Sequence, residues 1–268
     1  MVRRFLLMLL GGLLAAGATM AGIATGVGNA VAGNSEPVAK PTVVLVHGEF
    51  TDTTSWDAVA AELRGRGHTV VVPENPLRGP VTDARAVAAA IAGIDGPIVL
   101  VGHAYGGAVI SNIHLPNVAA LVFVAAYAPL RGESLSFDMD PGRFPGSRAV
   151  APALRLKHLG GTSVDAYLAA ERFHDVYAQD LDETAVAQLV AHQRSVAFSA
   201  NLEQNGPASW VGRPTWYVVA TADRVIPAAA QRFMAQRAAA RTTEVPASHA
   251  VLVSQPGAVA DVIEQATR

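Results

Sequence analysis

The sequence predicts an α/β fold: a doubly wound, mostly parallel sheet with helices on both faces and a helical cap insertion. Three observations predict it. From residue 42 onwards, short runs of β-branched apolar residues alternate with longer alanine-rich stretches, as in parallel strands joined by helices. The runs are apolar almost throughout, as expected for a sheet that is covered on both faces. The alternation stops after the fourth run and returns near residue 215, which indicates one insertion.

Six apolar runs are the predicted strands, at residues 42–48, 69–74, 97–103, 120–126, 215–221 and 242–245. Helices are expected at residues 56–66, 82–94, 105–112, 228–238 and 258–267. The core therefore comprises residues 42–128 and 209–268, and the cap comprises residues 129–208. The cap segment contains no run that resembles a strand. We expect it to be helical from two amphipathic patterns, one with Val164, Tyr167, Leu168 and Phe173 and one with Val186, Leu189 and Val190.

Composition narrows the class of protein and of partner. With 268 residues, of which 51% are hydrophobic, the chain can bury a large core as one domain with an insertion. The net charge of −2 provides no excess of cations for the phosphates of a nucleic acid, which we do not expect as a partner. The chain has no cysteine, and its eight histidines show no metal-binding spacing. We therefore expect neither a metal nor another cofactor.

The first residues have the pattern of an export signal. Arg3 and Arg4 precede an apolar run that begins at Phe5 and ends with the A-x-A tripeptide at 30–32. A transmembrane helix is the alternative, but the many glycines and alanines and the A-x-A ending favour cleavage. We therefore expect a signal peptide at 1–32 and a linker at 33–41. The protein is expected to be secreted, by the Sec or the twin-arginine route, with no stable membrane anchor after cleavage.

Residues that follow the predicted strands are the first candidates for a functional site, because ligands of open parallel sheets bind beyond the carboxyl ends of the strands. The third strand runs into VLVGHAYGG, in which Gly102 and Gly106 flank Ala104. This is the spacing of the G-x-S-x-G nucleophile elbow, with alanine in the place of the serine. Asp223 follows the fifth strand and His249 follows the sixth. Nucleophile position, acid and histidine therefore occur in an order that serine hydrolases use.

Five segments, in their order, resemble the motifs of α/β-hydrolases: VVLVHGEFTDTTSW, VGHAYGGAVI, VFVAAYAP, TADRVIP and SHAVLVSQP. In detail the chain is similar to small esterase-like enzymes whose plant relatives include methyl-ester esterases and hydroxynitrile lyases. The resemblance implies that Asp223 is the acid and His249 the base. It also implies that the backbone N–H groups of Glu49 and Tyr105 form the oxyanion hole. Two residues depart from the family pattern: Ala104 lacks the hydroxyl, and a Glu49 carboxylate opposes negative charge at an oxyanion site unless it points away.

The substrate pocket is expected to be mostly apolar, because the cap segment is rich in Ala, Leu, Val, Phe and Tyr. We expect a small or medium ester, or a similar carbonyl compound, as the small-molecule partner. His103, beside the elbow, is interpreted as a packing residue and not as a base. The candidate pocket residues are Phe50, Phe173, His174 and Trp210.

Ala104 decides which chemistry the sequence allows. A methyl group cannot attack an acyl carbon, and loss of the serine nucleophile of a well-studied protease costs a factor of roughly 10⁶ in turnover. Covalent ester hydrolysis is therefore expected to be nearly absent. Two explanations stay open: Ala104 is an engineered replacement that traps a bound ester, or it is natural and the His–Asp pair serves non-covalent acid–base chemistry, as in lyases. Ligand binding without turnover is a third interpretation.

Overall fold

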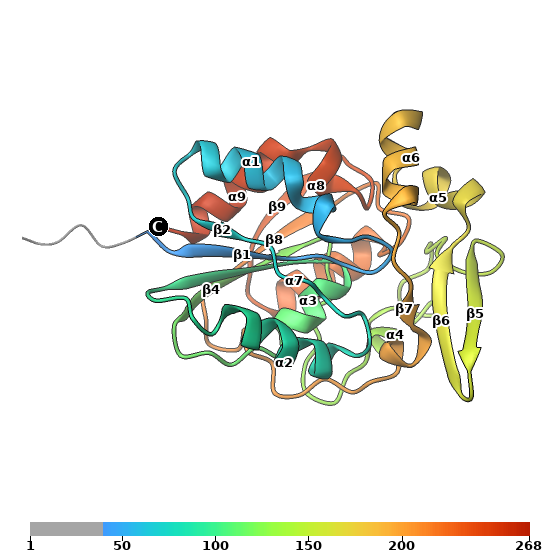
Figure 1. The fold of residues 1–268 in the computed structure, drawn as a ribbon, viewed down its shortest axis with the longest axis horizontal. Coiled ribbons are helices and arrows are strands. Elements are labelled where there is room, and N and C mark those ends of the chain that lie inside the picture. Colours follow the sequence, from blue (N-terminus) through green and yellow to red (C-terminus); the bar gives the residue numbers. More distant parts are fainter. Residues whose placement is uncertain (1–39) are drawn as a thin grey trace, which may run out of the picture. The chain divides into compact units, whose positions relative to one another are not determined.

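The computed structural model describes residues 40–268, and these form a six-stranded sheet with helices on both faces (Figure 1). The predicted signal peptide and most of the predicted linker lie outside the described residues. All strand pairs of this sheet are parallel, in the order β2-β1-β3-β4-β8-β9. The predicted doubly wound α/β fold is therefore confirmed. The strands are β1 Thr42–Val46, β2 Val70–Val71, β3 Ile98–His103, β4 Val118–Val124, β8 Thr215–Ala220 and β9 Arg241–Val245.

Helices cover the sheet in two layers (Figure 1). One layer consists of α1 Asp57–Gly65, α8 Val251–Ser254 and α9 Pro256–Ala266, and the other of α2 Pro80–Ile91, α3 Tyr105–Ile110 and α7 Ala228–Arg237. Alternate side chains of β1 belong to different cores: Val43 and Leu45 pack in one apolar cluster, and Val44 and Val46 in the other. This two-sided burial explains why the strands read as continuous apolar runs.

The cap combines helices with a second, three-stranded antiparallel sheet, in the order β5-β6-β7. The expectation of an all-helical cap was therefore wrong in part. Two consecutive glycines with positive φ, Gly160 and Gly161, form the turn between β5 and β6, so Val164, Tyr167 and Leu168 lie on a strand. The cap elements are α4 Leu135–Asp138, β5 Leu154–Gly160, β6 Ser163–Leu168, α5 Ala170–Tyr177, α6 Glu183–Ala191, β7 Val196–Ala197 and the 3₁₀ turn Phe198–Asn201.

The apolar spacing of residues 164, 167 and 168 favours a helix over a strand, because in a strand residue 167 lies on the opposite face from residues 164 and 168. Pairing decides between them. β6 pairs with β5 on one side and with β7 on the other, and β7 lies about thirty residues further along the chain. The second amphipathic pattern does form a helix, α6, with Val186 and Leu189 buried.

The cap lies beyond the end of the parallel sheet at which its strands finish (Figure 1). This is the end at which an open parallel sheet binds ligands. None of the helices within residues 40–268 has both the length and the apolar character that a membrane span requires.

Candidate active site

A sharp turn between β3 and α3 presents Ala104 in a strained backbone conformation, with φ 49° and ψ −121°. Few residues other than glycine adopt such a positive φ, and a strain of this kind costs about 1–3 kcal/mol. The flanking glycines are required by close contacts. A Cβ atom on Gly102 would lie 2.5 Å from the Gly106 carbonyl oxygen, and one on Gly106 would overlap the Val46 carbonyl oxygen. The nucleophile elbow predicted from the sequence is therefore present, with a methyl group at its tip.

Asp223 and His249 form a buried hydrogen-bonded pair. Asp223 Oδ2 lies 2.7 Å from His249 Nδ1, and both side chains are buried. Three further donors hold the carboxylate: the backbone N–H groups of Val225 (2.7 Å) and Ile226 (2.9 Å), and Gln231 Nε2 (2.7 Å). Because Asp223 accepts from all of them, His249 Nδ1 is the donating nitrogen and Nε2 carries the lone pair. The loop after β8 and the loop after β9 thus bring together the two residues that the sequence predicted as acid and base.

His249 Nε2 is buried and has no hydrogen-bond partner within residues 40–268. Two aromatic rings fix the imidazole: Tyr177 packs edge-on at 4.7 Å between centroids, and His103 lies at 4.8 Å. His103 Nε2 donates to the His249 carbonyl oxygen at 2.9 Å, and burial lowers the pKa of His103 well below its usual range. His103 is thus a neutral packing residue, as interpreted from the sequence. Tyr177 was not singled out, because nothing near it in the sequence indicates that α5 reaches His249.

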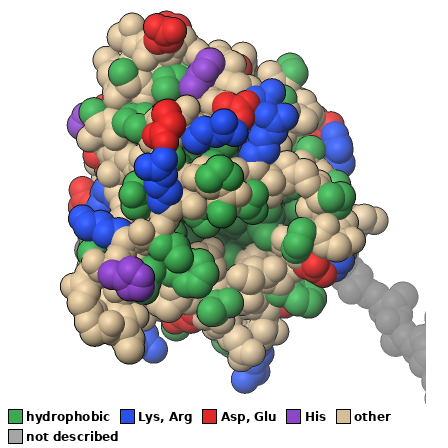
Figure 2. Space-filling model, turned by 90° about the vertical axis from the view of Figure 1, so that its right-hand side faces the viewer, with side chains coloured by type: hydrophobic (Ala, Val, Ile, Leu, Met, Phe, Trp, Pro, Cys, Tyr) green, Lys and Arg blue, Asp and Glu red, His purple; other side chains and the backbone are tan. Residues whose placement is uncertain are grey.

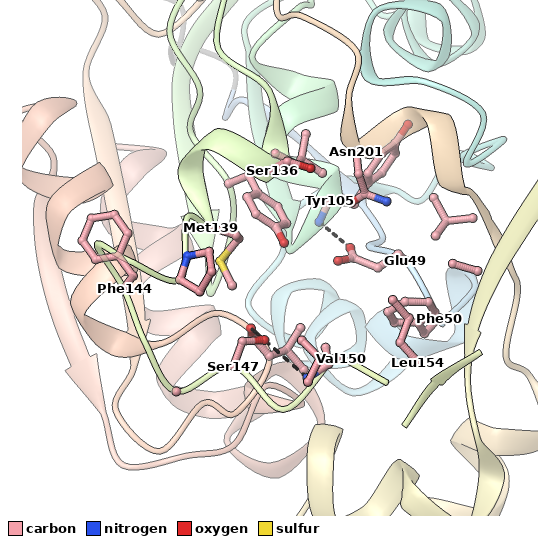
Figure 3. A pocket seen from close by; sticks show the side chains of 18 residues that line it. Glu49, Phe50, Tyr105, Ser136, Met139, Phe144, Ser147, Val150, Leu154 and Asn201 are labelled. Atoms are coloured by element: carbon pink, nitrogen blue, oxygen red, sulfur yellow. Dashed lines mark hydrogen bonds between the residues drawn. The ribbon is translucent and has the colours of Figure 1, made fainter. Parts of the chain in front are cut away.

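The Glu49 side chain points into the expected oxyanion hole. Its Oε2 accepts the backbone N–H of Tyr105 at 2.8 Å (Figure 3). Burial raises the pKa of Glu49, whereas nearby His249 and hydrogen bonds from the N–H groups of Glu49 and Tyr105 act to lower it. The resemblance implied that the N–H of Tyr105 would be available to a substrate. In the structure a carboxyl group of the protein already uses it, which corrects that expectation.

A cavity of about 240 Å³ opens between the elbow and the cap. Figure 2 shows hydrophobic side chains around a hollow on this face. Glu49 and Phe50 reach the cavity from the loop after β1 (Figure 3). Ala104 and His249 do not line it. Its other lining residues are Tyr105, Tyr127, Leu135, Ser136, Met139, Pro141, Phe144, Gly146, Ser147, Ala149, Val150, Leu154, Ala166, Val196, Asn201 and Val225.

Of the four predicted pocket residues, Phe50 lines this cavity and the other three do not. Phe173 is fully buried, with its ring 4.8 Å from that of Tyr177. The ring of His174 contacts the carbonyl oxygen of Leu181 at 3.1 Å.

Trp210 borders a separate groove at the beginning of β8. Trp210 therefore lies near the amino end of β8. The elbow, by contrast, follows the carboxyl end of β3. Strand direction explains the difference. The cap loop at 139–150, which supplies much of the lining, carries no periodic pattern that could have identified it from the sequence.

The part of the chain that the structure describes brings together no three His, Asp or Glu side chains that could hold a metal ion. Each carboxylate of the site instead accepts hydrogen bonds from protein donors. The arrangement can accept a proton at His249 Nε2 and can hydrogen-bond a ligand through Glu49. The expectation of a site without metal or cofactor stays a prediction.

Comparison with known proteins places this site in a family. Residues 43–262 match the family model described as "Alpha/beta hydrolase family". The chain is 29% identical over 244 residues to a pyrethroid hydrolase of Sphingobium wenxiniae, covering 82% of this chain and 85% of that protein.

Two solved structures share the fold at lower identity. Polyneuridine aldehyde esterase aligns with a TM-score of 0.75 at 18% identity, covering 86% of this chain and 100% of the other. A variant of tomato methylketone synthase I in complex with β-ketoheptanoate aligns with a TM-score of 0.69 at 17% identity, covering 85% and 97%. The motifs quoted from the sequence thus indicated the correct family.

Proposed function

Because this chain belongs to the alpha/beta hydrolase family, we propose that it acts on small or medium, mostly apolar carboxylic esters or related carbonyl compounds without forming an acyl-enzyme at residue 104. Its relatives include proteins named pyrethroid hydrolase and carbendazim hydrolyzing esterase, which supports a carboxylesterase-like protein. The finer part of the proposal, a route without an acyl-enzyme, rests on the residues of the site itself.

One observation carries this proposal: the Asp223–His249 pair is complete, and the residue at the tip of the elbow has no group that can form a covalent bond. The 2.7 Å contact fixes the tautomer in which Nε2 is basic. Ala104 offers only a methyl group at the tip of the elbow. A base without a protein nucleophile can act on water or on the substrate itself, so the chemistry is general acid–base catalysis.

A second departure from the family pattern supports a natural alanine over a trapping replacement. Glu49 and Ala104 are distant in sequence, yet the Glu49 carboxyl accepts the N–H of Tyr105, the residue after Ala104. A single replacement of the nucleophile would leave the oxyanion donors as they are in a serine enzyme. Glu49 and Ala104 both depart from the family pattern at the same site, which indicates that the two residues changed together.

The cavity supports an apolar substrate with one polar group. Its lining is dominated by aliphatic and aromatic side chains, with Glu49 as the one carboxylate among its lining residues. The relative named pyrethroid hydrolase is named after a hydrophobic ester. A cavity of about 240 Å³ is suited to the acyl or the alcohol part of such an ester.

The test is a panel of aryl esters, alkyl methyl esters and a pyrethroid, followed by product formation and by intact-protein mass spectrometry. We expect slow turnover that is lost in His249→Ala and that leaves no acyl adduct on the protein. A β-keto acid in the same panel tests the lyase-like alternative. An acyl adduct, or turnover that His249→Ala leaves unchanged, would contradict the proposal. Binding of esters with no turnover would favour the ligand-binding interpretation instead.

A further inference from the structure

We propose that Glu49 is the group that binds the substrate carbonyl oxygen, as a neutral carboxylic acid. One carboxyl oxygen accepts the N–H of Tyr105, and the other donates its hydrogen to the carbonyl oxygen of the ligand. This inference rests on the proposed function, because it needs a carbonyl compound in the cavity. In this proposal the Glu49 side chain takes the role that the family resemblance assigned to backbone N–H groups.

Glu49 lies where the cavity meets the elbow. Among the residues that line the cavity, Glu49 is the one Asp, Glu, His, Lys or Arg. It also contacts the elbow directly, through the 2.8 Å hydrogen bond from Tyr105. Neither His249 nor Ala104 lines the cavity. A carbonyl compound bound there therefore meets Glu49 before it meets any other acid–base group of the site.

The hydrogen bond from Tyr105 to Glu49 can form with either protonation state of the carboxyl group. An ionised Glu49 would repel the negative charge that develops on a carbonyl oxygen, while using a donor that could stabilise that charge. A protonated Glu49 can instead donate a hydrogen bond from its own hydroxyl. Its Oε2 accepts from Tyr105 N in either state, so the geometry is compatible with the neutral acid and needs no movement to reach it.

The charges around Glu49 decide which state is populated. Burial is the largest influence and raises the pKa of Glu49, and Asp223 also raises it. Protonated His249 and the hydrogen bonds from the N–H groups of Glu49 and Tyr105 act to lower it. The buried phenols of Tyr127 and Tyr177 face the same region, and burial raises the pKa of both well above the usual range, so neither contributes charge. A carboxyl group in an apolar site can stay protonated at neutral pH and serve as an oxyanion donor, as in ketosteroid isomerase.

For an ester the proton balance closes on two residues, Glu49 and His249, which lie close enough for the charge of His249 to lower the pKa of Glu49. Water forms a bond to the acyl carbon and gives a proton to His249 Nε2, while the carbonyl π bond breaks and its oxygen takes the Glu49 proton. The tetrahedral adduct then loses the alcohol, which leaves with the proton from His249. The new carbonyl forms as the hydroxyl returns its proton to Glu49. Ester and water become acid and alcohol, and both residues return to their initial states.

Two substitutions of matched size distinguish hydrogen-bond donation by Glu49 from mere filling of the cavity. Glu49→Gln keeps an acceptor for Tyr105 and a donor for the ligand, but it cannot ionise. Glu49→Met fills similar space and offers no donor. The first readout is the infrared carbonyl stretch of a bound aryl methyl ketone, which has the carbonyl group and no leaving group. We expect a shift to lower frequency in the parent chain and in Glu49→Gln, and no shift in Glu49→Met.

The second readout is turnover against pH, in the parent chain and in Ala104→Ser. The neutral form of Glu49 is the active one, so turnover falls as pH rises through the raised pKa. Glu49→Gln removes this fall. Glu49→Met lowers turnover about 10²–10³-fold below Glu49→Gln, the loss expected for one oxyanion donor.

The two proposals fail on different results. Equal turnover or equal ketone frequencies in the Gln and Met variants would overturn the role of Glu49, as would a ketone that does not bind. A protein whose Glu49 shows only the carboxylate band, and no carboxylic-acid band that Glu49→Gln removes, would overturn it as well. A bound ketone that is shifted by Glu49, in a chain that hydrolyses no ester, would leave this inference standing and refute the ester proposal alone.

Discussion

Ala104→Ser should create hydrolysis of a short-chain aryl ester. The structure contains the other parts that the reaction needs. The elbow already holds residue 104 at φ 49°, and His249 Nε2 has no other partner within residues 40–268. A serine Oγ at the tip of the elbow would supply that partner. The proton of the serine can then pass to His249, which Asp223 orients at 2.7 Å.

The size of the gain depends on Glu49. A serine nucleophile is worth up to roughly 10⁶ in turnover. An oxyanion donor that is missing costs about 10²–10³, and the N–H of Tyr105 is engaged by Glu49. If Glu49 only occupies the donor, the gain is therefore about 10³–10⁴. If Glu49 donates as a neutral acid, the gain approaches the full value.

The assay is the release of a nitrophenol from its acetate ester, measured for the parent chain, Ala104→Ser and the double variant with His249→Ala. Ala104→Gly is the matched control, because it relieves the strained φ without adding a hydroxyl. Circular dichroism confirms that each variant is folded. A folded Ala104→Ser that hydrolyses no faster than the parent, or a gain that survives His249→Ala, would contradict this prediction.

Four further outcomes are expected. In Asp223→Asn, an amide NH2 group takes the place of the oxygen that accepts from Gln231 Nε2 and His249 Nδ1. Two buried donors then lack an acceptor, which should lower the free energy of unfolding in urea by about 2–6 kcal/mol. Phe144→Ala, at the cavity, should change the ratio of kcat/KM values between short and long esters, whereas Trp210→Ala, away from it, should mainly cost about 3–5 kcal/mol of stability. The raised pKa of Glu49 means that its contribution to stability is complete below the unfolded-state pKa and is lost as pH rises through the folded-state pKa. Glu49→Gln should therefore lose less stability than the parent from acid to neutral pH, by thermal melting. Secreted protein should begin at or near residue 33 by mass spectrometry; an uncut chain in the membrane fraction would contradict the signal peptide.

Local sequence was sufficient for the sheet and for the elbow. The apolar runs became β1, β3, β4 and β8 within a few residues of their predicted limits, because strands buried on both faces need apolar side chains at every position. β9 also formed where it was predicted, but it is an edge strand and four of its five residues are exposed. Gly102 and Gly106 were identified from spacing alone. Glycine is required at both positions because the neighbouring backbone is too close to leave room for a Cβ atom. Such a constraint is visible directly in the sequence.

The cap was less predictable because its strands depend on partners that lie far apart in the chain. Val164 and Leu168 fitted a helical spacing, and only the pairing of β6 with β5 and β7 made that segment a strand. The same holds for the pocket. Phe173 and Trp210 have the right chemistry, but their side chains serve the core and the opposite end of the sheet, which depends on strand direction and on helix packing.

The amino-acid sequence alone specifies which groups are available for chemistry: a missing hydroxyl at Ala104, an acid and a base after the last two strands, and a carboxylate at Glu49. Their order along the chain is enough to bring Asp223 and His249 together, because the carboxyl ends of parallel strands meet at one edge. Only the tertiary structure decided where the Glu49 carboxyl points. A side chain with several rotatable bonds is directed by what surrounds it, and here burial and the N–H of Tyr105 direct it into the oxyanion site.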